Sequence, residues 1–293
     1  MKKTLCEGSM LPNTPWAHKL IVYLNLINYM DNLEYIKNEI ENTQVIIIAG
    51  GRAKRMGKID KPKALLKLNG KCLMDYTIEF LKNSGFKNFV FLLGYKHEEI
   101  EAHVGNGSKY GINANYSVEP ETMKGRGKAL KYALMNNKID RNKRSIICYP
   151  DDLYLDRNLP IKLLLHHLHG IESKNILVTA LFTSGTEYPY GVGKIDSEQY
   201  VMEFVEKPFI QKYTNTAFYV IEPEVYSEIE KKIDLDSEDS PEFEQAVLPD
   251  LAKARKVISM IVPSSVWLPI NTNKEHSVAE KFLNSNGEKD SEY

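Results

Sequence analysis

The stretch VIIIAGGRAKRMGKIDKPKAL, residues 45–65, decides the fold class. Its first part is a short apolar, β-branched run, which is typical of a parallel strand buried on both faces. Gly50 and Gly51 follow directly, and glycines at the end of a strand let backbone N–H groups approach a phosphate closely. The loop is also rich in cations: Arg52, Lys54, Arg55, Lys58, Lys61 and Lys63. These features predict a strand followed by a triphosphate-binding loop.

The loop differs from the two best-known phosphate-binding patterns. It contains neither the GxGxxG of dinucleotide-binding folds nor the GxxxxGK[ST] of P-loop proteins. A Gly50–Gly51 pair alone would be equally consistent with a plain turn. The neighbouring cations, and Pro62 which stiffens the loop, favour phosphate binding instead.

Strand-like and helical patterns alternate after this loop, which predicts an α/β fold with right-handed crossovers. We expect a doubly wound, mostly parallel central sheet with helices on both faces, and a second half that continues the same sheet. The predicted strands cover residues 88–93, 112–117, 145–149, 176–181, 200–205 and 216–220, and the predicted helices 73–82, 127–134, 223–231 and 242–254.

The residues before and after these alternating elements are expected to form extensions of the domain. Residues 1–42 read as a polar tail and a helical extension, and Met30 is an alternative start of the native protein. One domain is expected over residues 43–285, with a nucleotide-binding half over 43–155 and a sugar-phosphate-binding half over 156–285. Residues 286–293 read as a frayed tail.

Composition excludes several classes of function. Lys plus Arg number 38 and Asp plus Glu 39, so no overall field attracts nucleic acid or an anionic membrane. The longest apolar stretch, residues 20–27, is too short to span a bilayer. The three cysteines form no CxxC pair, which argues against a disulfide framework. We therefore expect a cytoplasmic protein without nucleic-acid or membrane partners.

The segments AGGRAKRM and KPKALL resemble the opening signature of the sugar-phosphate nucleotidyltransferases, AGGxGTRM followed by PKxLL. This family, the NDP-sugar pyrophosphorylases, includes mannose-1-phosphate guanylyltransferases and glucose-1-phosphate thymidylyltransferases. The resemblance extends over residues 44–284 and implies the nucleotide-diphospho-sugar transferase-like fold. Later motifs follow in the family's order: LLGY at 92–95, VEPETMKGRGKAL at 118–130, CYPDDLY at 148–154, YGVGKID at 190–196, VEKP at 205–208, NTAFYV at 215–220 and WLPINT at 267–272.

The resemblance implies transfer of a nucleoside monophosphate from a nucleoside triphosphate to a sugar 1-phosphate, which releases pyrophosphate. The attacking phosphate is already an anion at neutral pH, so the reaction needs cations and positioning rather than a general base. Arg55 would hold the β- and γ-phosphates, Lys63 the reacting phosphoryl group, and Lys207 the sugar phosphate.

The resemblance also implies which other residues bind the substrates. Glu119 stands where members that take UTP or dTTP usually present Gln to the base. A carboxylate only accepts hydrogen bonds, so it suits the N1–H and N2–H₂ of guanine, or the amine of cytosine, and GTP is the favoured nucleotide. The nucleotide-binding residues would be Ala49, Gly50, Gly51, Glu119, Gly125 and Arg126, and the sugar-binding residues Tyr190, Gly191, Glu206 and Asn215.

The predicted Mg²⁺ site departs from the family pattern. Asp151 follows a strand, where the family places a metal-binding Asp. Pro269 occupies the position of the second carboxylate, and Asn271 in the IN dipeptide takes the place of a ligand that some uridylyltransferases use. Asn271 could equally cap the following helix, and Asp152 is an alternative ligand.

Three other readings remain open at this stage. A catalytically silent subunit that senses an NDP-sugar would explain Pro269 and the altered loop. A cytidylyltransferase acting on a phospho-alcohol would use the same chemistry. A glycosyltransferase is less suitable, because Asp151 and Asp152 are adjacent rather than spaced as DxD. The particular sugar, the pathway and the oligomeric state are not predicted, and a homo-oligomer is compatible with the sequence.

Overall fold

The computed structural model describes residues 32–52, 56–57, 60–123, 125–239 and 241–287. The chain divides into two units, Met1–Glu41 and Asn42–Tyr293. Residues 32–41 of the first unit form a helix. The predicted polar tail and the predicted phosphate ligand Arg55 lie outside the described residues. The frayed tail was predicted over residues 286–293; residues 286 and 287 instead end a helix, and residues 288–293 lie outside the described residues.

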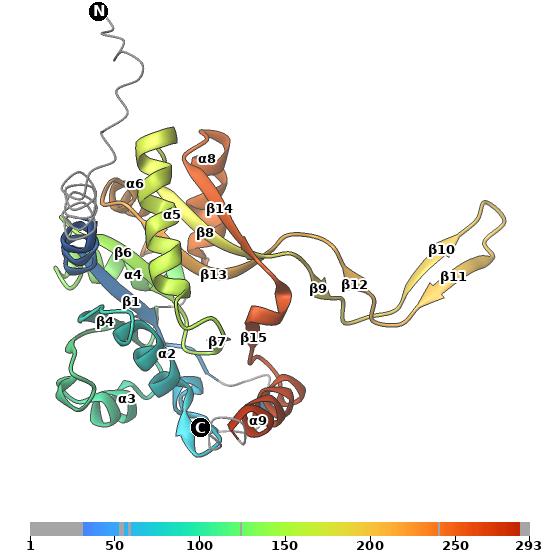
Figure 1. Ribbon diagram of the computed structural model, residues 1–293, viewed down its shortest axis with the longest axis horizontal. Coiled ribbons are helices and arrows are strands. Elements are labelled where there is room, and N and C mark those ends of the chain that lie inside the picture. The colour runs from blue at the N-terminus through green and yellow to red at the C-terminus, as the bar shows by residue number, and fades with distance from the viewer. Residues whose placement is uncertain (1–31, 53–55, 58–59, 124, 240, 288–293) are drawn as a thin grey trace, which may run out of the picture. The chain divides into compact units, whose positions relative to one another are not determined.

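The second unit is built around a seven-stranded sheet with the order β14-β8-β13-β6-β1-β4-β5 (Figure 1). Neighbouring strands are parallel, except that β13 runs antiparallel to both β6 and β8. The predicted fold class, a mostly parallel sheet between helices, is confirmed. The strands are β1 (Thr43–Ile48), β4 (Asn88–Leu93), β5 (Asn113–Val118), β6 (Arg144–Cys148), β8 (Val178–Thr183), β13 (Thr214–Ile221) and β14 (Val257–Val262).

Strand β1 lies between β4 and β6, and all six of its residues are buried. Val45 stands opposite both Phe89 and Ile146. An apolar, β-branched strand suits this place because both of its faces are covered. The parallel strands β1, β4 and β6 therefore end at the same edge, and the Gly50–Gly51 pair leaves the sheet there.

Helices cover both faces of this sheet. Helices α4 and α6 pack on each other, and their apolar residues share one core with β1, β4, β8 and β13. Helix α5 packs on β8, β13 and β14, and its buried His167 bonds to Thr179 of β8 at 2.9 Å. The helices are α2 (Leu73–Lys82), α3 (His97–Val104), α4 (Arg126–Met135), α5 (Leu159–Lys174), α6 (Glu224–Lys232), α7 (Phe243–Ala246), α8 (Leu248–Lys253) and α9 (Asn273–Gly287).

The predicted helix over residues 242–254 is instead two helices, α7 and α8, which meet at Val247. Pro249 lies in the first turn of α8. A proline has no N–H to donate and clashes with the preceding turn, so it is tolerated at the start of a helix but not in its interior. The break follows from that restriction.

Several short elements connect this framework. Strands β2 (Lys67–Leu68) and β3 (Lys71–Cys72) form a hairpin before α2, and β7 (Asp152–Tyr154) pairs with β15 (Trp267–Pro269). Within the described residues the single-turn helices are η2 (Lys63–Leu65), η3 (Ser108–Tyr110) and η4 (Ser264–Val266).

A β-ribbon, which we call the arm, occupies residues 184–213 between β8 and β13 (Figure 1). It contains the pairs β9 (Thr186–Glu187) with β12 (Phe209–Ile210), and β10 (Val192–Ile195) with β11 (Val201–Val205). The strand predicted over residues 200–205 therefore exists as β11. We expected it to continue the central sheet, but among the described strands it pairs with β10 alone. Every residue from 187 to 207 is exposed.

Candidate active site

A cavity of about 500 Å³ opens at the edge of the sheet where β1 and β6 end. Ligands of α/β proteins commonly bind at this edge, because loops from several parallel strands meet there. Ten residues predicted for the site line the cavity: Ala49, Gly50, Gly51, Lys63, Glu119, Gly125, Arg126, Asp151, Asn215 and Asn271.

Lys63 lines this cavity and contacts two other residues predicted for the site. Its ammonium group forms an ion pair with Asp151 Oδ2 and donates a hydrogen bond to Asn271 Oδ1 at 3.0 Å. The side chain of Lys63 is 14% exposed and that of Asp151 21%, so the pair is only partly accessible to water. Asp151 lies 88 positions after Lys63 in the chain and Asn271 lies 208 positions after it, and both contact the Lys63 ammonium group.

The pairing of β7 with β15 brings Asn271 to Asp151. Pro269 stands opposite Asp152, and the Ile270 N–H donates to the Asp151 carbonyl oxygen at 2.8 Å. The proline that breaks the family's metal pattern therefore has a structural place at the end of this ladder, and Asn271 comes two residues later.

Thr272, and not Asn271, provides the side-chain cap of α9. Thr272 Oγ1 accepts from the Glu275 N–H at 3.3 Å, and Glu275 Oε2 accepts from the Asn271 N–H at 2.8 Å. The first bond is a side-chain N-cap, and the second joins Glu275 to the residue before the cap. The amide oxygen of Asn271 faces Lys63 instead.

The carboxylate of Asp151 and the amide oxygen of Asn271 form a donor set that fits Mg²⁺, which prefers oxygen ligands. Both already face a cationic group, the Lys63 ammonium. The neighbouring Asp152 is engaged elsewhere, since its Oδ1 accepts from the Trp267 indole N–H at 2.7 Å. Burial, together with the nearby Asp151, raises the pKa of Asp152 well above its ordinary value.

Glu119 presents a buried carboxyl group to the same cavity. Burial raises its pKa to about 7, and Oε2 has no hydrogen-bond partner among the described residues. The absence of side chains at Gly50 and Gly94 makes room for it: a Cβ on Gly94 would lie 2.6 Å from Oε1. A buried, unpaired acceptor costs stability unless a ligand supplies donors, so Glu119 is suited to bind donor groups.

Arg126 is tied to protein groups rather than free for a phosphate. Its guanidinium pairs with Glu242, lies 3.9 Å from Glu244 and stacks 4.8 Å from the Tyr149 ring centroid. These partners of Arg126 were not predicted from the sequence. The acidic segment EFE at 242–244 was a visible signal, but no local pattern places it beside a residue more than a hundred positions away.

Four predicted substrate ligands do not line this cavity. Tyr190, Gly191, Glu206 and Lys207 all lie on the exposed arm. Lys207 Nζ approaches Glu206 Oε1 at 3.8 Å, and both side chains are about half exposed. The structure therefore separates the two motifs YGVGKID and VEKP from the cavity that collects the others.

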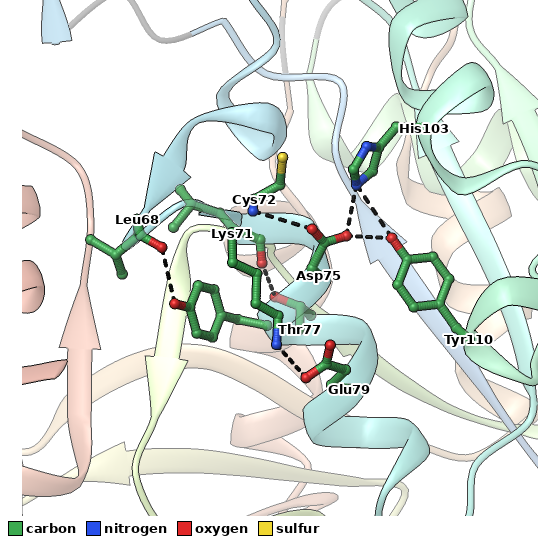
Figure 2. Close-up of polar contacts among 10 residues, drawn as sticks. Leu68, Lys71, Cys72, Asp75, Thr77, Glu79, His103 and Tyr110 are labelled. Carbon is green, nitrogen blue, oxygen red and sulfur yellow. Dashed lines mark hydrogen bonds and ion pairs between the residues drawn. The ribbon is translucent and has the colours of Figure 1, made fainter. Parts of the chain in front are cut away.

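A second group of ionisable residues lies at the start of α2 (Figure 2). Cys72, Asp75 and His103 have donor atoms within 4.8 Å of one another. Asp75 already accepts from the Cys72 N–H at 3.2 Å, from His103 at 2.7 Å and from the Tyr110 hydroxyl. Because its carboxylate accepts three hydrogen bonds from protein groups, we interpret this group as a helix-capping network.

Comparison with known proteins places the chain in a family. The family model described as nucleotidyl transferase matches residues 44–284. The catalytic subunit beta of mannose-1-phosphate guanylyltransferase from Drosophila pseudoobscura is 26% identical over 80% of this chain and 60% of its own length. D-glycero-alpha-D-manno-heptose 1-phosphate guanylyltransferase from Campylobacter jejuni is 30% identical over 63% of this chain and 78% of its own.

The fold also matches a solved structure. A Bacillus anthracis protein assigned as a glucose-1-phosphate thymidylyltransferase superposes with a TM-score of 0.60 and 19% identity, over 82% of this chain and 94% of that one. The chain spans 60% and 50% of the lengths of two curated relatives, the Drosophila subunit and a Synechocystis UTP–glucose-1-phosphate uridylyltransferase. No helix among the described residues is long and apolar enough to cross a membrane. The ten expected residues that line the cavity all lie within the matched range, residues 44–284. This match shows that the chain belongs to the nucleotidyl transferase family.

Proposed function

We propose that this protein transfers a nucleoside monophosphate from a nucleoside triphosphate to a sugar 1-phosphate, giving an NDP-sugar and pyrophosphate. The observation that carries this proposal is the convergence of Lys63, Asp151 and Asn271 in a cavity bordered by the Gly50–Gly51 loop. A glycine loop, a cation and hard oxygen donors together suit a triphosphate and a divalent ion.

The proposed reaction needs positioning and charge neutralisation more than proton transfer. An oxygen of the sugar phosphate attacks the α-phosphorus in line, and pyrophosphate leaves. Lys63 would face the phosphoryl group on which charge accumulates, and the backbone at Gly50 and Gly51 would approach the other phosphates closely. A Mg²⁺ ion held by Asp151 and Asn271 would neutralise phosphate charge when bound.

Glu119 supports GTP as the nucleotide within this proposal. Guanine offers two adjacent donors, N1–H and N2–H₂, and the buried carboxyl group has an unpaired acceptor. Uracil offers one donor and two acceptors, so it would leave an acceptor facing the ionised carboxylate. The relatives named for guanylyl transfer are consistent with this preference.

The direct test is a matrix of the four common triphosphates against mannose, glucose and heptose 1-phosphates with Mg²⁺, read by pyrophosphate release. We expect release that requires both substrates, with GTP the best nucleotide. Release from no combination would refute the transferase proposal. Equal or better rates with UTP would refute the base assignment alone.

A further inference from the structure

The first turn of α4 is fastened to the segment that precedes α7. The Gly127 N–H donates to the Pro241 carbonyl oxygen at 3.0 Å, and a Cβ on Gly127 would lie 2.6 Å from that oxygen. Lys128, which is buried, donates to the Ser237 carbonyl oxygen. Any other side chain at position 127 would clash with the Pro241 carbonyl, so the close approach that brings Arg126 to α7 depends on glycine.

Two carboxylates hold the guanidinium of Arg126 against Tyr149. Its Nε donates to Glu242 Oε2, its Nη2 lies 3.9 Å from Glu244 Oε2, and its central carbon lies 4.8 Å from the Tyr149 ring centroid. Glu244 Oε1 also accepts from the Tyr149 hydroxyl at 3.2 Å. Burial, together with Glu244, raises the pKa of Tyr149 well above its ordinary value, so this hydroxyl remains a donor. The orientation of the guanidinium is therefore set by three neighbouring groups.

The Arg126–Glu242 pair keeps hydrogen-bonding capacity for a ligand. Both residues line the cavity, and their side chains are 42% and 27% exposed. Among the described residues, no group hydrogen-bonds to the Nη groups of Arg126 or to Glu242 Oε1. Since two carboxylates lie beside one guanidinium, a further phosphate would meet a net negative charge. A neutral hydroxyl group, which both donates and accepts, suits this pair better.

The same network contains a residue that was predicted to bind the sugar. Of the four predicted sugar-binding residues, all of which the structure describes, Asn215 alone lines this cavity. Asn215 Nδ2 donates to the Tyr219 hydroxyl, which donates to Glu244 Oε1 at 3.1 Å. Hydrogen bonds and an aromatic contact thus connect Asn215 with Arg126.

Other parts of the cavity are already assigned to the nucleotide. Glu119 borders an adjoining cavity of about 380 Å³, whose described lining includes neither Arg126 nor Glu242. The Lys63–Asp151 ion pair faces the proposed phosphate and metal positions, and no hydrogen bond or ion pair between described residues joins it to Arg126 or Glu242. The sugar of the acceptor is therefore the ligand group left for the Arg126–Glu242 pair.

We infer that Arg126 and Glu242 determine which sugar 1-phosphate is accepted, by binding neighbouring hydroxyl groups of its sugar ring. Arg126 donates to one hydroxyl oxygen, and Glu242 accepts from the next. Tyr149 and Glu244 act through Arg126 and are positioning residues. The pair selects a polyhydroxylated sugar over a phospho-alcohol without neighbouring hydroxyl groups. The sugar assignment rests on the proposed function, because the acceptor belongs to that reaction.

Deoxy analogues of the best acceptor test this assignment in the wild-type enzyme and in Arg126→Met. In the wild type, removal of the hydroxyl that Arg126 binds should raise the KM for the acceptor about tenfold or more. Arg126→Met should show a similar rise with the intact sugar and no further rise with that analogue, because the partner of the hydroxyl is already gone. If every analogue raised KM equally in both enzymes, the inference would be wrong.

Arg141→Met is the matched control. Arg141 has the same 42% exposed side chain and pairs with a carboxylate, Glu230, but it does not line the cavity. Both KM values should stay unchanged in this variant. In Arg126→Met the KM for GTP should also stay within about threefold of the wild type. A rise in the KM for GTP alone would assign Arg126 to the nucleotide, and a rise in neither KM would leave it without a substrate role; both results overturn the inference.

Thermal melting shows whether Arg126→Met is folded. If it is not, Arg126→Lys provides the same test, because a lysine keeps the positive charge beside Glu242 and Glu244 but cannot reproduce the planar guanidinium. The same loss of dependence on one hydroxyl is expected, and its absence would overturn the inference.

Failure of the proposed function can be distinguished from failure of this inference. If the wild-type protein transfers no nucleotide to any sugar 1-phosphate, the proposed function fails. Calorimetric titration with mannose, glucose and heptose 1-phosphates then decides the inference, which requires binding that Arg126→Met loses and Arg141→Met keeps. If the wild-type enzyme is active but its choice of sugar does not depend on Arg126, the proposed function stands and the inference fails.

Discussion

Lys63 is the residue on which the largest effect is expected, because a single ammonium group faces two oxygen donors of the candidate metal site. We predict that Lys63→Ala lowers turnover by roughly two or more orders of magnitude, since it removes a cation from a multiply charged transition state. Steady-state rates of pyrophosphate release measure this loss.

Lys61 offers the matched control. It lies two residues earlier on the same loop, is exposed and does not line the cavity. Lys61→Ala should therefore retain near-normal turnover. If the two variants lost activity equally, loop charge in general, rather than the position of Lys63, would be responsible. The same test applied to Arg55→Ala addresses the predicted β,γ-phosphate contact, for which we also expect a loss of two or more orders of magnitude.

The raised pKa of Glu119 leads us to predict that nucleotide binding depends on pH. Burial raises its pKa to about 7, so the carboxyl group is neutral below that pH and ionised above it. Guanine donors pair best with the ionised form, and the apparent affinity for GTP should rise by up to about tenfold from pH 6 to pH 8. Glu119→Gln should flatten this dependence and move the preference towards UTP.

The free energy of unfolding of the ligand-free protein should fall with rising pH, whereas the affinity for GTP should rise. The folded pKa of Glu119 lies above the ordinary value of 4.5, so the folded state binds the proton more tightly than the unfolded state. The resulting stabilisation is fully present below about pH 4.5 and is lost as the pH rises through about 7. Denaturant unfolding of the wild type and Glu119→Gln across this window measures it; parallel profiles would contradict the assignment.

At the scale of elements, the pairing of β7 with β15 positions the residues of the candidate metal site. It holds Asn271 beside Asp151, while Thr272 at the next position caps α9. Neighbouring residues thus have separable roles, one towards the cavity and one towards the helix.

This separation makes a sharp prediction. Asp151→Asn should nearly abolish activity, because it removes the carboxylate of the site. Asn271→Ala should raise the Mg²⁺ concentration that gives half-maximal rate, whereas Asn271→Asp should preserve or lower it by restoring a carboxylate. Magnesium titrations of the initial rate provide the measurement.

Thr272→Ala is the control for this titration. Loss of an N-cap costs about 1 kcal/mol of stability, so this variant should melt at a lower temperature with an unchanged Mg²⁺ requirement. If Asn271→Ala behaved in the same way, Asn271 would have a structural role only, and Asp152 would become the first candidate for the second ligand.

At the scale of the whole molecule, the features that the sequence predicted best are those with local causes. The apolar run at residues 45–49 predicted the central strand β1, and the run NFVFLL predicted β4 at the observed residues 88–93. A strand that is buried on both faces consists mainly of apolar, β-branched residues. This composition can be recognised in the sequence without knowing which strands lie beside it. The order of the motifs then identified the family, which the match over residues 44–284 confirms.

Features that depend on distant contacts were not predictable in this way. Glu242 reaches Arg126 and Tyr149 lies under the same guanidinium, although no spacing in the sequence links the three. The arm is a second case. A strand was predicted over residues 200–205 as part of the central sheet, and the sequence pattern could not show that it pairs with β10 outside that sheet.

The measurement that tests the central claim most directly follows the phosphorus atoms of GTP through one reaction. The account predicts that, with Mg²⁺ and a sugar 1-phosphate, label at the α-phosphate of GTP enters an NDP-sugar, while label at the γ-phosphate appears in pyrophosphate. Both products should form about a hundredfold or more slowly in the Lys63→Ala variant. Release of the γ-label as free phosphate, or failure of the α-label to reach a sugar with any triphosphate, would contradict nucleotidyl transfer.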